Sequence, residues 1–85
     1  MKEFTVIIKD PVGIHARPAG LLVKEATMYD SNITLHFDGK SADCKRIFSV
    51  MGLAVKHGDK LKVVINGSDE AKAAENLKHF FNNNL

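Results

Sequence analysis

The chain has 85 residues, of which 45% are hydrophobic and 26% are charged, and its formal net charge is +2. This length suits one domain with a single core, residues 1–85, and the small net charge argues against a dedicated nucleic-acid-binding protein. One cysteine, Cys44, excludes an internal disulfide, and the N-terminus has no apolar signal region, so we expect a soluble cytoplasmic protein without membrane insertion.

The first half of the chain predicts a strand, a helix and a hairpin. Apolar residues alternate along the first strand at Phe4, Val6 and Ile8. Apolar residues at helical spacing follow after residues 10–13, namely Ala19, Leu22, Val23 and Ala26. A second strand over 33–37 runs through Asp38–Gly39 into a short third strand over 40–44. Asp-Gly is a strong hairpin signal, because a type I′ turn needs positive φ at both central residues.

The second half predicts a short helix over 47–53, a fourth strand over 60–65 and a last helix. Ser68 or Asp69 can cap the last helix. Its apolar stripe consists of Ala73, Ala74, Leu77, Phe80 and Phe81. Asn82–Asn84 continue a helix poorly, so we expect this end to fray. The order βαββαβα predicts an α+β fold, a four-stranded antiparallel sheet with helices on one face.

The strongest functional signal is the segment Gly13-Ile14-His15-Ala16-Arg17-Pro18-Ala19. It places His15 where a loop becomes a helix, beside free N–H groups and a partial positive charge that attract phosphate. A neutral imidazole there can carry a phosphoryl group, with Arg17 pairing to the phosphate oxygens. Pro18 fits only the first helical turn. Because the residue before a proline resists the α region, propensity alone starts the helix at Pro18, with Arg17 as its cap.

The other three histidines, His36, His57 and His79, lie at positions that we expect to be exposed. No histidine has a second histidine or cysteine at a metal-ligand spacing, so no metal site is expected. The chain also lacks paired carboxylates and a Walker loop, which argues against a stand-alone enzyme and gives no indication of a cofactor.

The chain resembles the HPr family, the histidine-containing phosphocarriers of the bacterial phosphoenolpyruvate:sugar phosphotransferase system, over essentially its whole length. Residues 13–19 look like the family's active-site signature, and residues 45–53 look like its second signature around the short helix. The resemblance implies an open-faced β-sandwich with three helices. It also implies that His15 accepts phosphate on Nδ1 from phosphorylated Enzyme I and passes it to a sugar-specific Enzyme IIA. Arg17 and the amides near Ala16 and Arg17 would hold the phosphate, with Pro18 at the helix start.

We expect a monomer. The resemblance further implies a docking surface on the first and short helices. We assign to this surface Gly20, Leu21, Lys24, Ile47, Phe48 and Met51. Its expected basic rim consists of Arg17, Lys24, Lys45 and Arg46. Spacing alone is equally consistent with Phe48 and Met51 lying in the core, and the resemblance favours docking. Gly20 would let a partner approach near His15.

One position departs from the family. Many members from low-GC Gram-positive bacteria carry a regulatory serine just before the short helix, and this chain has Arg46 there. Arg46 cannot be phosphorylated, which puts a catabolite-repression role in doubt, and the nearby Ser49 does not match the motif position. The alternatives are a paralogous regulatory phosphorelay, a protein-binding regulator and a small nucleic-acid-binding module.

Overall fold

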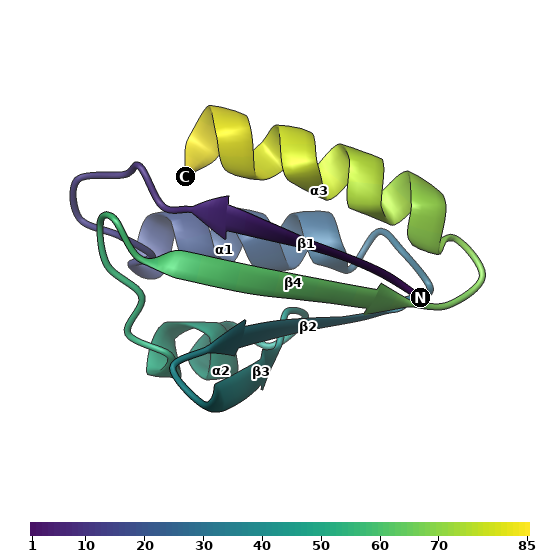
Figure 1. The fold of residues 1–85 in the computed structure, drawn as a ribbon, viewed down its shortest axis with the longest axis horizontal. Helices are drawn as coiled ribbons and strands as arrows, with labels where there is room; N and C mark the ends of the chain where they lie inside the picture. Colours follow the sequence, from purple (N-terminus) through teal and green to yellow (C-terminus); the bar gives the residue numbers. More distant parts are fainter.

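The computed structural model describes residues 1–85. Its elements are β1 (Lys2–Ile7), α1 (Ala16–Ala26), β2 (Asn32–Phe37), β3 (Lys40–Asp43), α2 (Ile47–Gly52), β4 (Lys60–Asn66) and α3 (Glu70–Asn84). This order confirms the predicted βαββαβα arrangement (Figure 1).

The four strands form one antiparallel sheet in the order β1-β4-β2-β3. In the register, Leu35 of β2 lies opposite both Ala42 of β3 and Val63 of β4, and Val63 lies opposite Phe4 of β1 in turn. In Figure 1, α1 and α2 lie behind the strands, and α3 runs along β1. The open-faced β-sandwich is therefore confirmed.

One core fills the space between the sheet and the helices. The alternation expected in β4 is confirmed, since Leu61, Val63 and Ile65 are fully buried. On α1 the buried stripe includes Ala19, Leu22 and Ala26. No helix in the structure is long and apolar enough to cross a bilayer.

The β2–β3 hairpin has the turn that its sequence predicts. Asp38 and Gly39 both have positive φ, 52° and 77°. The third strand ends at Asp43, one residue earlier than expected, and the Cys44 N–H donates to the Ile33 carbonyl oxygen at 2.9 Å. Cys44 is fully buried, and burial raises the pKa of its thiol to about 12. Its thiol therefore stays neutral and fills space in the core.

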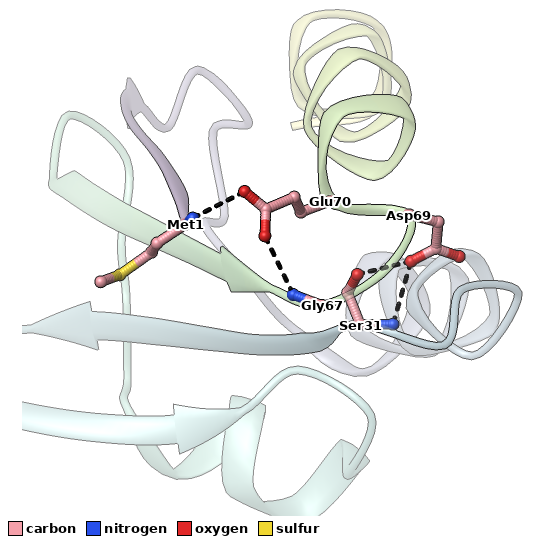
Figure 2. Close-up of polar contacts among 5 residues, drawn as sticks. All are labelled: Met1, Ser31, Gly67, Asp69 and Glu70. Atoms are coloured by element: carbon pink, nitrogen blue, oxygen red, sulfur yellow. Dashed lines mark hydrogen bonds and ion pairs between the residues drawn. The ribbon is translucent and has the colours of Figure 1, made fainter.

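The start of α3 is tied to a turn far away in the sequence (Figure 2). Asp69 is the N-cap residue, but its carboxylate does not cap the helix. Instead it accepts hydrogen bonds from the Ser31 hydroxyl and from the backbone N–H groups of Asp30 and Ser31. The prediction of a side-chain cap by Ser68 or Asp69 is therefore wrong, because the Asp69 carboxylate finds its donors in the turn between α1 and β2.

The neighbouring Glu70 joins the same end of α3 to the chain's first residue. Its carboxylate contacts the N-terminal amine of Met1 at 2.6 Å and accepts from the Gly67 N–H at 3.2 Å (Figure 2). The pKa of Glu70 is lowered mainly by the contact with the N-terminal amine, and next by the hydrogen bond from the Gly67 N–H. The pKa of Asp69 is lowered mainly by the hydrogen bond from the Ser31 hydroxyl, and next by the bonds from backbone N–H groups.

The expectation that the C-terminal end of α3 frays is wrong. The helix continues to Asn84, and Leu85 is only 4% exposed. The main-chain oxygen of Leu85 accepts hydrogen bonds from the N–H groups of Lys9 and Asp10. Burial of Phe81 and Leu85 thus outweighs the weak helix propensity of the three asparagines.

Candidate functional site

His15 is the N-cap residue of α1. Its backbone is extended, with φ −108° and ψ −173°, and its carbonyl oxygen accepts the Ala19 N–H at 2.9 Å. The helix begins at Ala16, so the start at Pro18 expected from propensity is wrong. Pro18 and Ala19 are buried, and this packing of the first turn outweighs the resistance of Arg17 to the helical region before a proline.

The start of α1 presents two backbone N–H donors that no group of the protein occupies. No side chain caps α1, and its first turn contains no acidic residue. The N–H groups of Ala16 and Arg17 have no carbonyl to bind within the helix, and Pro18 has no N–H to offer. The partial positive charge of the helix end is therefore available to an anion beside the His15 ring.

The segment before His15 is held against the loop between α2 and β4. Gly13 has a φ of +84°, and a Cβ atom there would lie 2.4 Å from the Val55 carbonyl oxygen. The next residue, Ile14, is buried, and its N–H donates to the same Val55 oxygen at 3.0 Å. A glycine at position 13 therefore fixes where His15 lies.

His15 lies in a shallow hollow of about 400 Å³. The hollow is lined by Asp10, His15, Arg17, Pro18, Leu21 and Asn84. The His15 side chain is 41% exposed, and its Nε2 lies 3.8 Å from Asp10 Oδ1. Arg17 is exposed, and its guanidinium forms no hydrogen bond or ion pair with the chain. The hollow thus combines an accessible imidazole with an unpaired guanidinium.

Two residues of this hollow, Asp10 and Asn84, were missed by sequence reasoning. The sequence pattern places Asp10 in the connection after the first strand and Asn84 in the end of the last helix, with no functional signal at either. Lys9 and Asp10 bind the main-chain oxygen of Leu85, which brings the end of α3 to the His15 loop. No local pattern carries this long-range contact, although the turn-forming Asp10 five positions from a functional histidine is a weak signal.

The four large apolar residues assigned to docking divide into an exposed pair and a half-buried pair. Phe48 is 85% exposed and Leu21 is 46% exposed, and we call these two the apolar patch. Ile47 and Met51 are half-buried and pack against the core. Because Phe48 is exposed, it does not lie in the core. Met51 is half-buried, so it belongs partly to the core.

Helices α1 and α2 meet at Gly20. The nearest neighbour of a Cβ atom at this position would be Ile47 Cδ1, 3.8 Å away. The α2 side chain of Ile47 therefore lies beside Gly20 of α1. Leu21 follows Gly20 in the chain and Phe48 follows Ile47, so both lie next to this contact between the helices. Lys24 is exposed in the last turn of α1.

The basic rim is smaller than expected. The Lys45 ammonium donates to the Tyr29 carbonyl oxygen at 2.7 Å, and Lys45 is half-buried. Lys45 therefore joins the segment before α2 to the turn between α1 and β2 and is not a free surface charge. Arg46 is the N-cap residue of α2 and is well exposed, with Nε 3.7 Å from Asp43 Oδ2.

The remaining histidines lie outside the hollow. His36 and His79 are exposed, and His57 Nδ1 lies 3.1 Å from the Lys9 carbonyl oxygen. No group of three or more His, Cys, Asp or Glu side chains is arranged to hold a metal ion. His15 is thus the one histidine placed at a helix N-terminus with a guanidinium beside it.

Comparisons with known proteins cover nearly the whole chain. A family model described as the phosphotransferase system HPr component phosphorylation site matches residues 2–83. The phosphocarrier protein HPr of Mycoplasma capricolum is 41% identical over 78 residues, covering 92% of this chain and 88% of its own. HPr of Lysinibacillus sphaericus is 47% identical over 76 residues, covering 89% and 84%. A crystal structure of HPr from Thermoanaerobacter tengcongensis matches with a TM-score of 0.92 at 38% identity, covering 96% and 92%.

Proposed function

This chain belongs to the HPr family of phosphotransferase-system phosphocarriers, and from that membership we propose that His15 is the residue that carries the phosphoryl group. The donor is phosphorylated Enzyme I and the acceptor is a sugar-specific Enzyme IIA. The observation that supports this most strongly is the exposed His15 imidazole at the uncapped start of α1, with the unpaired Arg17 beside it.

The transfer itself needs only a free lone pair on the ring. The lone pair on His15 Nδ1 forms a bond to phosphorus, while the bond between phosphorus and the donor breaks and the donor keeps that electron pair. In the onward step the acceptor forms the new bond, and Nδ1 recovers its electron pair. No cofactor takes part, and the protein is a stoichiometric carrier in both steps.

The transferred charge is stabilised by groups that already lie at the helix end. The N–H groups of Ala16 and Arg17 and the Arg17 guanidinium are the donors for the phosphate oxygens, and Pro18 keeps the first turn in place. A helix N-terminus stabilises a nearby anion by about 0.3–1 kcal/mol when exposed. This modest stabilisation suits a group that must leave again.

Partners bind through the apolar patch of Leu21 and Phe48. Ile47 and Met51 are half-buried on α2 and pack against the core, and Gly20 and Lys24 lie one turn apart on α1. A small patch favours rapid release over tight binding. The protein acts as a monomer in the cytoplasm, where its phosphorylated donor is made, and Arg46 removes regulation by serine phosphorylation before α2.

The test is a two-step transfer with purified partners. Phosphoenolpyruvate and Enzyme I first load the protein, and an unphosphorylated Enzyme IIA domain is then added. We expect the label to enter wild type, to pass to the Enzyme IIA domain within the mixing time, and to be absent from His15→Ala. A folded wild-type protein that loads but retains its label with several Enzyme IIA domains would overturn the carrier role in sugar uptake and favour a regulatory relay.

A further inference from the structure

Asp10 is the one acidic residue that lines the hollow around His15. Its Oδ1 lies 3.8 Å from His15 Nε2. Contacts of this kind in a ligand-free site are often longer than a hydrogen bond and shorten when the reacting group binds. The carboxylate therefore lies within reach of Nε2, the ring nitrogen that does not take the phosphoryl group in the proposed function.

The Asp10 carboxylate is held in place by its own loop. The same Oδ1 accepts the Val12 N–H at 2.9 Å, and the Asp10 carbonyl oxygen accepts the Gly13 N–H at 3.0 Å. The Asp10 N–H donates to the main-chain oxygen of Leu85 at 2.8 Å. One bond thus holds the side chain directly and two hold its backbone, and the side chain is only 24% exposed, so little ordering is needed before it acts on the ring.

We propose that Asp10 is a positioning residue for phosphoryl transfer: its carboxylate keeps the proton of His15 on Nε2 and so leaves the lone pair on Nδ1. A neutral imidazole carries one proton, and the nitrogen that bears it cannot attack phosphorus. A carboxylate near one nitrogen favours the tautomer with the proton there. This inference rests on the proposed role of His15.

The same contact acts after the transfer. The phosphorylated ring keeps its proton on Nε2 beside Asp10, while the phosphate oxygens lie on the Nδ1 side with Arg17 and the free amides. When the acceptor takes the phosphoryl group, the Nδ1–P bond breaks and its electron pair returns to Nδ1. The proton on Nε2 stays in place, so the leaving group is a neutral imidazole. In this proposal the negative Asp10 carboxylate acts at Nε2, and the positive groups act on the phosphoryl group at Nδ1.

The direct test is ¹⁵N NMR of the His15 ring in the unphosphorylated protein, at a pH where the imidazole is neutral. We expect the Nε2–H form to dominate in wild type. In Asp10→Asn, the ratio of the Nε2–H form to the Nδ1–H form should fall about two- to fivefold, the range expected for loss of an exposed ionic contact. Asn keeps an oxygen for the Val12 N–H, so the loop is preserved. Asp10→Ala removes both contacts and should shift the ratio at least as far.

The matched control is Asp43→Asn. Asp43 Oδ1 accepts the Lys45 N–H at 2.9 Å in the same kind of turn, but before α2. An unchanged ratio in Asp10→Asn, or an equal shift in Asp43→Asn, overturns the proposal. The rate of loading by Enzyme I should fall by a similar factor in Asp10→Asn only. If wild type takes no phosphoryl group at all, the proposed function fails, while the tautomer ratio still decides whether Asp10 holds the ring.

Discussion

Gly13 lies so close to Val55 that a Cβ atom at position 13 would come within 2.4 Å of the Val55 carbonyl oxygen. The contact fixes the loop immediately before His15 onto the segment between α2 and β4. Backbone cannot move aside as a flexible side chain can, so the position of the imidazole depends on this glycine.

Gly13→Ala should therefore destabilise the protein by about 2 kcal/mol or more, measured by urea denaturation, because a backbone clash adds to the strain at positive φ. Gly58→Ala is the matched control. Gly58 has nearly the same φ, +87°, and nothing within 4 Å of a Cβ atom, so its cost should be only about 1 kcal/mol. Equal losses in the two variants would contradict the role of the Val55 contact.

Arg17→Ala should slow loading by Enzyme I by about 10- to 100-fold, which corresponds to the loss of hydrogen bonds to a charged group. Its stability should not change, because the guanidinium is exposed and unpaired. Arg17→Lys keeps the charge but loses the planar fork, so it should recover only part of the rate. Lys72→Ala, an exposed change on α3, controls for net charge. An Arg17→Ala rate close to wild type would exclude Arg17 from phosphate binding.

Phe48→Ala should raise the KM for phosphorylated Enzyme I by about 5- to 30-fold, as for an interface hot spot. The same variant should change the free energy of unfolding by less than about 0.5 kcal/mol, because the side chain is 85% exposed. Met28→Ala is the control, since Met28 is also exposed but follows the far end of α1. Parallel losses of stability and transfer in Phe48→Ala would count against a docking role.

Stability should fall in acid partly through Asp69. The Ser31 hydroxyl and the backbone bonds lower its folded-state pKa, so the unfolded chain takes up this proton at a higher pH than the folded protein. The stabilisation is fully present above the unfolded value of about 3.9 and is lost as the pH falls through the folded-state pKa.

Ser31→Ala removes the first of these causes. We expect a lower urea midpoint near neutral pH and a smaller further drop in acid than in wild type, measured from neutral pH down to about pH 2. Ser68→Ala, in the exposed turn before α3, is the control. A Ser31→Ala protein with the acid dependence of wild type would show that the hydroxyl does not tune Asp69.

Local pattern predicted the elements well because each depends on neighbours in the sequence. The Asp38–Gly39 turn and the buried face of β4 follow from backbone preference and period-two alternation. The place of His15 and Arg17 at the start of a helix was also predictable locally, because both lie within a few residues of the proline and glycine signals that mark this start.

Features that depend on distant contacts were not predicted. Burial of Pro18 sets the start of α1, and burial of Leu85 sets the C-terminal end of α3. In both helices this burial outweighs local propensity. The Lys45 ammonium was read as a free charge, but it binds the Tyr29 carbonyl oxygen. The sequence predicts the Asp69 carboxylate as a helix cap, but it binds Ser31. The Asp10 N–H binds the main-chain oxygen of Leu85. In each case the partner comes from a different part of the chain.

The most direct test of the account is intact-mass measurement after incubation with phosphoenolpyruvate and Enzyme I. We expect one added phosphoryl group on wild type and on the control His36→Ala, labile in acid and stable in alkali, and none on folded His15→Ala. A phosphoryl group that persists on His15→Ala, or one that is lost with His36→Ala, would contradict the central claim that His15 carries it.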